Sequence, residues 1–273
     1  MNYLKRHIEE LFIECTGLNA NLKVLDSFVS ERSAELSQNF PFPGQGLISM
    51  ISAYRDLSQL EGGNNLYTTN VDYNLTTDNL SPEVNRLLSY ISCLTVTQIF
   101  EVFESFLKNI LAEIISQNPL LMDILKLECE SASFDNVRRC LYKIQGKSNK
   151  GFIKALRIIS PFFKTHEENN IWKRNMSHWF DLIGRVRDLV IHSRLIMNSE
   201  FELYIKESHR SKLFKLHFTI SGDRPNAKIS LTPYQAYSII DYIFEYAHLI
   251  YKGLSIDFKI DLDFNFKNTT LTN

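Results

Sequence analysis

The sequence has few of the residues that build disulfide frameworks, metal ribbons or membrane anchors. Its 273 residues include only 4 cysteines, 10 glycines and 7 prolines, and no two cysteines form a CxxC pair. That spacing excludes a zinc ribbon and a thioredoxin-type motif. No stretch approaches the roughly 18 uninterrupted apolar residues of a membrane helix, and the N-terminus lacks the apolar run of a signal peptide. We therefore expect a cytoplasmic protein that does not enter a membrane.

The chain also lacks a global excess of charge of either sign. Its net charge is -1 at pH 7, so any affinity for nucleic acid has to come from local clustering of basic residues. Apolar residues make up 44% of the chain and charged residues 22%, as in ordinary globular proteins. At this length the chain can bury a substantial core.

One segment has no acidic residue. Between residues 136 and 166 there are eight Lys and Arg but no Asp or Glu. One interpretation is a solvated helix face; the other is a groove that binds a phosphate backbone. On the second interpretation the RNA-binding residues are Arg138, Arg139, Lys143, Lys147, Lys150, Lys154 and Arg157.

Helical spacing of apolar residues dominates the first half of the chain. The pattern predicts one or two helices over residues 3–37, a short helix over about 47–60 and a surface loop over 61–79. Ser81 and Pro82 make a good helix start. A wide apolar stripe then continues to about residue 117, which is typical of the spine of a helical bundle.

The second half of the chain mixes helical and alternating patterns. Shorter helices are predicted over residues 120–130, 135–144, 151–162 and 170–198. Strict alternation predicts a β-hairpin over about 213–231. A capping box at Thr232 and Gln235 opens a helix that Gly253 is expected to close. Alternation over about 256–266 predicts a further strand that joins the hairpin.

The expected fold class is therefore mainly α, a helical bundle with a small antiparallel β-sheet made of the hairpin and the C-terminal strand. Three segments are expected. Residues 1–80 form an N-terminal helical extension, residues 81–254 form the bundle with the hairpin as an insertion, and residues 255–273 form a C-terminal strand and tail.

Arg187, Asp188 and His192 form a compact set for handling a phosphodiester. Arginine holds a phosphate in a bidentate fork, and histidine transfers protons near neutral pH. On an unbroken helix Arg187 and His192 lie about 140° apart and cannot both face one phosphate. Either Arg187 lies at a helix start, after the weak point at Gly184, or a second copy completes the site across a two-fold axis. The alternative is that His192 is an ordinary helical histidine and Arg187 pairs with Asp181 or another acid.

Residues 187–193 (RDLVIHS) resemble the signature of the HEPN superfamily, in which an Arg and a polar residue are followed by a His after four to six positions. Residues 98–107 (QIFEVFESFL) resemble the first long helix of that family, which often carries a Phe-Glu pair. Residues 231–252 resemble its closing helix. The resemblance covers about residues 83–254 and implies four to five core helices, with the motif at the start of a helix.

The resemblance implies a homodimer that cleaves RNA at a composite active site without a metal or another cofactor. His192 would activate the ribose 2′-hydroxyl or protonate the leaving oxygen. Arg187 would bind the scissile phosphate, and Asp188 would orient one or both. The expected products carry a 2′,3′-cyclic phosphate and a 5′-hydroxyl. The family further implies a prokaryotic defence or toxin-type effector, with an antitoxin or another defence protein as an expected partner.

Two other functions stay open. One is a catalytically silent HEPN-type module that binds RNA, a nucleotide or a protein, and the other is a helical adaptor. A second arginine and histidine, Arg174 and His178, nearly duplicate the motif with one residue fewer between them. They fall outside the family spacing and stay an alternative site.

Overall fold

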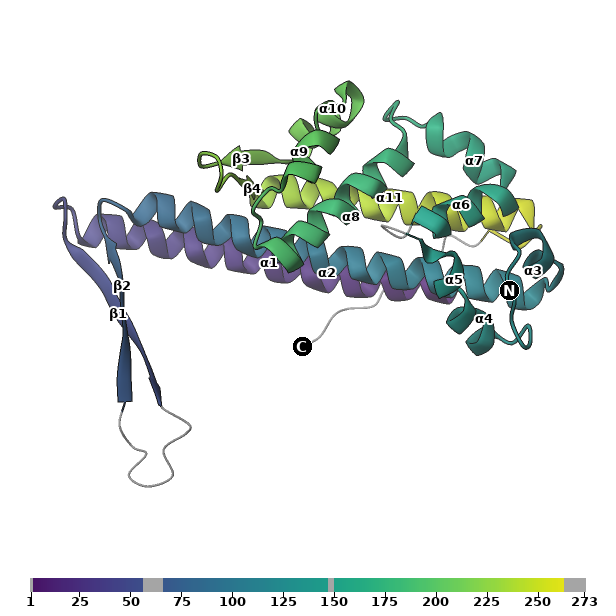
Figure 1. The fold of residues 1–273 in the computed structure, drawn as a ribbon, viewed down its shortest axis with the longest axis horizontal. Coiled ribbons are helices and arrows are strands. Elements are labelled where there is room, and N and C mark those ends of the chain that lie inside the picture. Colours follow the sequence, from purple (N-terminus) through teal and green to yellow (C-terminus); the bar gives the residue numbers. More distant parts are fainter. Residues whose placement is uncertain (1, 56–65, 147–149, 263–273) are drawn as a thin grey trace. The chain divides into compact units, whose positions relative to one another are not determined.

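A computed structural model of the protein describes residues 2–55, 66–146 and 150–262. As the sequence predicts, the protein is mainly helical, and the described residues include two small two-stranded antiparallel sheets (Figure 1). The chain divides into two compact units. One consists of Met1–Leu22 together with Tyr90–Asn273, and the other of Lys23–Ser89.

The smaller unit contains a two-stranded β-ribbon between the later turns of α1 (Lys5–Asn39) and the first turns of α2 (Leu80–Gln117). Strand β1 (Gly46–Arg55) pairs antiparallel with β2 (Leu66–Thr76). The predicted short helix over 47–60 and surface loop over 61–79 are therefore wrong within the described residues. Nearly every residue of the ribbon is exposed, so neither strand has the buried row of side chains that makes a strand recognisable by alternation.

Long helices carry the core of the larger unit. The first turns of α1 and most of α2 each contact α11 (Pro233–Asp257) through aromatic rings. Phe12 of α1 meets Phe244 of α11 edge-on at 5.3 Å between ring centroids, and Phe103 of α2 lies 5.7 Å from Tyr246 of α11. Helix α1 is unbroken, and α2 covers the whole range predicted for the bundle spine.

Helix α2 is long and apolar enough to cross a membrane by length and composition alone. However, 56% of its most apolar window is buried inside the protein. The core helix of a soluble protein has the same length and composition, so this property of α2 does not decide whether the helix enters a membrane.

The capping box predicted for α11 is present. The Thr232 hydroxyl accepts a hydrogen bond from the Gln235 amide, and the Gln235 side chain accepts one from the Thr232 amide. The expectation that Gly253 closes this helix is wrong, because α11 continues to Asp257. Gly253 instead permits close packing on α7 (Pro161–Glu168): a Cβ atom at Gly253 would lie 3.0 Å from the Cβ of Phe163.

Short helices follow α2 near the predicted positions, namely α3 (Leu120–Leu125), α4 (Phe134–Cys140), α5 (Tyr142–Gln145) and α6 (Lys150–Ile159). The helix predicted over 151–162 ends earlier than expected. Ser160 caps a separate helix, α7, by accepting a hydrogen bond from the Phe163 amide, and Pro161 occupies its first turn.

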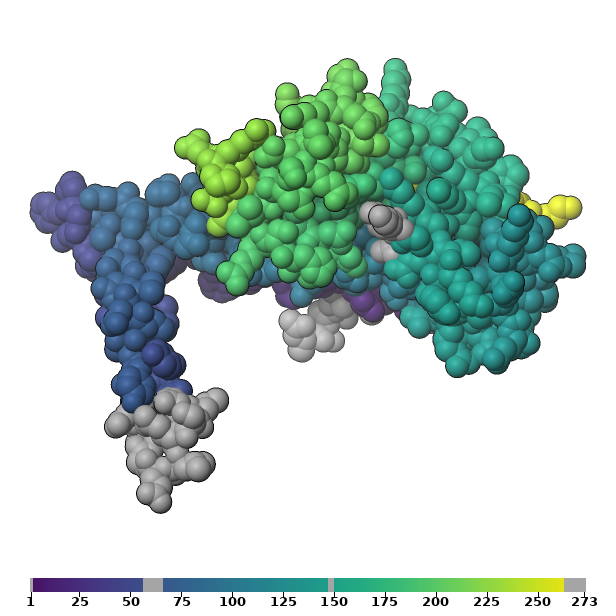
Figure 2. Space-filling view, in the orientation of Figure 1, coloured from purple at the N-terminus to yellow at the C-terminus, as the bar shows by residue number. Residues whose placement is uncertain are grey.

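The remaining elements of this unit are α8 (Met176–Ser193), α9 (Ser199–Tyr204), α10 (Ser208–His217), β3 (Thr219–Ser221) and β4 (Lys228–Ser230). In Figure 2 the green part of the visible surface comes from the exposed residues of α8 to α10. The predicted hairpin is correct for β3 and β4, which pair antiparallel. It is wrong for residues 213–217, because α10 buries Leu213, Phe214 and His217 at helical spacing.

The strand predicted over 256–266 is also wrong as far as the structure describes it, to residue 262. The helical turn continues instead: the Phe258 amide donates to the Leu254 carbonyl at 3.0 Å, and the Ile260 amide donates to the Ser255 carbonyl at 2.8 Å. Asn2 then holds this end of the chain by donating to the Asp261 carbonyl at 3.0 Å. Residues 263–266 lie outside the described residues.

Candidate functional site

Helix α8 carries every residue of the Arg-His motif. It starts at Met176, where the Asn175 side chain accepts hydrogen bonds from the Ser177 and His178 amides at 3.0 and 3.2 Å. Gly184 lies buried inside the unbroken helix. The expectation that Arg187 lies at a helix start after Gly184 is therefore wrong. Arg187 lies in the interior of α8, and His192 lies in its last turn.

Core packing turns one face of α8 toward α2. Phe180 is fully buried and lies 5.1 Å from Phe100 of α2 between ring centroids. Arg187 follows Phe180 by seven residues, which is close to two helical turns, so both side chains leave α8 on the same face. Arg187 consequently reaches the polar side of α2, next to the buried phenylalanine.

Three carboxylates bind the Arg187 guanidinium. Its Nε and Nη2 atoms lie 2.6 and 2.5 Å from the same carboxylate oxygen of Glu101. Its Nη1 lies 2.8 Å from Asp188, and its Nη2 lies 3.4 Å from Glu104. The alternative interpretation of Arg187 as an ion-pair partner thus describes this geometry, although Asp181 is not the partner. Asp181 pairs with Lys150 and Arg185 instead.

The three carboxylates differ in burial. The side chains of Glu101 and Asp188 are 48% and 45% exposed, whereas that of Glu104 is 4% exposed. Burial raises the pKa of Glu104 to about 7, against the opposing effect of the Arg187 charge. One Glu104 carboxylate oxygen is buried without a hydrogen-bond partner among the described residues. Glu104 therefore exchanges its proton near neutral pH, a property typical of functional sites and also of structural ion pairs.

Glu101 and Glu104 are functional candidates that sequence reasoning missed. Each follows a buried phenylalanine, Phe100 or Phe103, and the two acids are three residues apart, which places them on one face of α2. The resemblance of residues 98–107 to a Phe-Glu helix drew attention to this segment. The second Phe-Glu pair, Phe103 and Glu104, is the sequence signal that could have indicated these acids. Their ion pairs to Arg187 could not be predicted in this way, because they depend on contacts between distant parts of the chain.

His192 is exposed at the end of α8, and in the described part of the chain no hydrogen bond or ion pair involves its side chain. It follows Asp188 by four residues, so these two side chains share a face of the helix. The structure therefore brings Arg187 and Asp188 into direct contact and places His192 one turn further along. Within one chain His192 stays about 140° from Arg187 around the helix.

The basic run is less uniformly positive than its sequence suggests. Acids from other elements oppose two of its members: Lys150 lies 2.8 Å from Asp181, and Arg157 pairs with Glu167 and Glu168. Other members bind neutral groups, as Arg138 binds Asn109, Arg139 binds Asn136 and Lys143 binds the Glu128 carbonyl. Lys154 is exposed on α6, and Lys147 lies outside the described residues.

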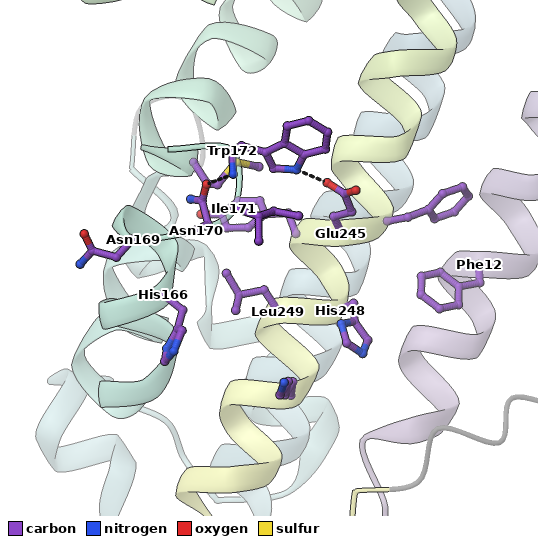
Figure 3. Close-up of a pocket in the computed structure, with 13 residues that line it drawn as sticks. Phe12, His166, Asn169, Asn170, Ile171, Trp172, Glu245, His248 and Leu249 are labelled. Atoms are coloured by element: carbon purple, nitrogen blue, oxygen red, sulfur yellow. Dashed lines mark hydrogen bonds between the residues drawn. The ribbon is translucent and has the colours of Figure 1, made fainter. Parts of the chain in front are cut away.

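A cavity of about 660 Å³ lies in the same unit, between α1, the segment before α8, and α11 (Figure 3). Its lining is mostly apolar, with Phe12 and Leu249 on opposite helices. The Trp172 indole donates a hydrogen bond to Glu245 at 2.5 Å beside it. None of Arg187, Asp188 and His192 lines this cavity, so it gives no support to the motif.

Comparison with protein-family models, with curated proteins and with solved structures finds no match for this chain. The resemblance to the HEPN superfamily therefore rests on the motif residues and on the order of the helices around them. Over residues 2–55, 66–146 and 150–262, no group of three or more His, Cys, Asp and Glu side chains is arranged to hold a metal ion.

Proposed function

We propose that this protein is a metal-independent endoribonuclease of the HEPN type, a cytoplasmic prokaryotic defence or toxin-type effector, with Arg187, Asp188 and His192 as its catalytic residues. The observation that supports this best is the fixed position of Arg187 on α8. Carboxylates hold the guanidinium beside Asp188 at the protein surface, and an exposed His192 follows one turn later.

In the proposed reaction the ribose 2′-oxygen attacks the neighbouring phosphorus, and the bond from phosphorus to the 5′-oxygen breaks. A neutral His192 imidazole accepts the 2′-hydroxyl proton. The resulting imidazolium then donates this proton to the leaving 5′-oxygen. Arg187 stabilises the charge that develops on the phosphate. Acid/base help of this kind contributes about a hundred- to ten-thousand-fold in rate.

A phosphate reaches Arg187 in this mechanism by displacing Glu101. Glu101 is 48% exposed, and an ion pair to so exposed a carboxylate contributes only about 0–1 kcal/mol. Glu104 and Asp188 keep the guanidinium in place during the exchange. Because the pKa of Glu104 is about 7, part of the negative charge beside Arg187 is absent at neutral pH.

The direct test is cleavage of RNA in EDTA by the wild type and by His192→Ala. Ile191→Ala is the matched control, since Ile191 is the exposed neighbour of His192 in the same helical turn. We expect the wild type and Ile191→Ala to cleave and His192→Ala to lose at least about a hundred-fold in rate. Cleavage that requires a divalent metal, or an undiminished rate in His192→Ala, contradicts the proposal.

The angular separation of Arg187 and His192 leads us to propose a homodimer in which each site takes Arg187 from one copy and His192 from the other. Mixing Arg187→Ala with His192→Ala tests this arrangement. Half of the dimers then contain both variants, and one of their two sites regains both residues, so activity should recover to about a quarter of the wild-type value. No recovery in dimers shown to be mixed contradicts the composite site.

The three carboxylates on Arg187 also favour a second candidate, a catalytically silent HEPN-type module that binds RNA, a nucleotide or a protein partner. A guanidinium already neutralised by acids contributes to stability and attracts phosphate weakly. This function predicts RNA or partner binding without cleavage across a broad set of substrates. It further predicts that Arg187→Ala lowers the melting temperature and leaves binding intact.

A further inference from the structure

A second arginine and histidine, Arg174 just before α8 and His178 in its first turn, line a separate hollow, which we call the basic hollow. It measures about 390 Å³ and is bounded by the segment before α8, the first turn of α8, and α10. Five basic side chains line it: Lys173, Arg174, His178, His209 and Lys212. His178 precedes Arg187 by nine residues, so the hollow lies about 14 Å from Arg187 along the helix axis.

The side chains that line the basic hollow include no acid to balance the basic ones. The acids nearby are engaged: Asp181 pairs with Lys150 and Arg185, Glu168 with Arg157, and Glu207 with Arg210 at 2.7 Å and with His209 at 3.8 Å. Within the described ranges, no carboxylate pairs with Lys173, Arg174 or Lys212. Like charges gathered without acids are costly unless an anion joins them.

The two histidines meet inside this cluster. Their rings lie 4.8 Å apart between centroids, at an angle of 39°. Burial and then the neighbouring His209, Arg210 and Lys150 lower the pKa of His178. A bound anion would supply the charge that this cluster is missing.

Side chains build the hollow, and the end of α8 does not. The amides of Ser177 and His178 already donate to the Asn175 side chain. The Arg174 guanidinium lies over the rings of Trp172 and Tyr242, at 5.9 and 5.7 Å from their centroids. This stacking orients the guanidinium and leaves its hydrogen-bond donors for a ligand.

Apolar walls complete the hollow. Trp172, Leu213 and Leu216 line it together with the basic side chains. Its volume lies at the lower end of the range for small-molecule sites. A ligand that satisfies the whole lining has one strongly charged group with several hydrogen-bond acceptors and a compact apolar or flat body.

We propose that the basic hollow binds a small phosphate monoester, whose dianionic group lies among Arg174, His178, His209 and Lys212 and whose body contacts Trp172 and Leu216. A phosphate monoester dianion carries three acceptor oxygens, which suits a fork from arginine together with point charges from lysine and histidine. The site is distinct from the Arg187 site and does not rest on the proposed ribonuclease activity.

Calorimetric titration of the full chain with phenyl phosphate tests the site, with inorganic phosphate and the monoanion phenyl sulfate for comparison. We expect phenyl phosphate to bind more tightly than both. The double variant His209→Gln/Lys212→Gln should lose at least about tenfold in affinity, since it removes the lysine charge and the imidazole that face the phosphate. Lys215→Gln is the matched control, an exposed lysine of α10 that does not line the hollow. Its affinity should stay unchanged.

A measurement on the wild-type protein keeps the test independent of how the variants fold. In NMR spectra, the ring signals of His178 and His209 should shift as phenyl phosphate is added. The shifts should level off along a binding curve that gives the same Kd as calorimetry. The proposal is overturned by the absence of saturable binding, by equal affinity in the double variant, or by unmoved histidine signals. Displacement of phenyl phosphate by a short RNA without terminal phosphates would assign the hollow to RNA and also overturn it.

Discussion

Two arginine-histidine pairs, one at the start of helix α8 and one in its second half, lie in opposite electrostatic surroundings. Near its start, Arg174 and His178 lie among further basic side chains, and no acid lines their hollow. Near its end, three carboxylates hold Arg187, and His192 is exposed. An arginine and a histidine at short spacing therefore do not define a phosphate site by themselves. The charges that other helices bring to them decide what the pair can bind.

The two proposed sites differ in the kind of phosphate recognition expected of them. The start of α8 offers unneutralised cations and suits a ligand that stays bound. The end of α8 offers a guanidinium whose charge is offset until a carboxylate moves away. Under the proposed function, we expect this site to bind a ground-state phosphate weakly and to contribute to catalysis through the charge that develops in the transition state.

The largest effect is expected for Arg187→Ala on RNA cleavage. Loss of the guanidinium removes the group proposed to stabilise the transition-state charge, and we expect the rate in EDTA to fall by about a hundred- to a thousand-fold. Arg86→Ala is the matched control, because Arg86 also pairs with a glutamate but is 70% exposed and lies in the smaller unit. An equal loss in both variants would show that the effect is not specific to the end of α8.

A smaller effect, on stability, is expected for Glu104→Gln. The pKa of Glu104 is raised from 4.5 to about 7 in the folded protein, so the folded state holds this proton more tightly than the unfolded state. The free energy of unfolding should therefore fall as the pH rises from about 4.5 to about 7, by about 3 kcal/mol in total. Glu104→Gln removes this titration, so its stability relative to the wild type should increase across that window.

Chemical denaturation at pH 5 and pH 8 measures this change. Glu101→Gln is the control, since it removes a carboxylate from the same guanidinium without burial. Glu101→Gln should change the free energy of unfolding by no more than about 1 kcal/mol at either pH. A stability difference between Glu104→Gln and the wild type that is the same at both pH values would contradict the role given to burial.

The smallest effect is expected at the other end of the helix, for Asn175→Ala. Its side chain caps α8, and its loss should cost about 1 kcal/mol of stability. Fraying of the first turn should also weaken the binding of phenyl phosphate in the basic hollow. Asn198→Ala removes the equivalent cap from α9, where the side chain accepts from the Phe201 amide. It should cost a similar stability and leave phenyl phosphate binding unchanged, and equal losses of binding in both variants would contradict the proposed site.

Local signals predicted much of the larger unit. The Ser81-Pro82 start and the apolar stripe placed α2 almost to the residue, and the capping box placed the start of α11. Both depend on interactions within a few residues of each other. Residues 213–217 and 256–262 alternate between apolar and polar side chains but have no such local signal. There the helical conformation that packs on the core prevails over the predicted strand.

The surroundings of the motif could not be predicted in the same way. Glu101 and Glu104 lie more than eighty residues before Arg187 in the chain, and packing of α8 on α2, as in the contact of Phe180 with Phe100, brings them together. The ion pairs of the basic run could not be predicted for the same reason, because its acidic partners come from α7 and α8. The ribbon of β1 and β2 was missed for another reason. Strands without a buried face have no alternation of apolar and polar residues by which they could be predicted.

The most direct test of the proposed activity is an analysis of the RNA ends produced in EDTA. The proposed role of His192 requires a 2′-hydroxyl at the cleaved bond, so products should carry a 2′,3′-cyclic phosphate and a 5′-hydroxyl. A substrate with a single 2′-deoxy sugar at that position should resist cleavage there. Products with a 5′-phosphate, or equal cleavage of the 2′-deoxy substrate, would contradict the assignment of Arg187, Asp188 and His192 as a ribonuclease site.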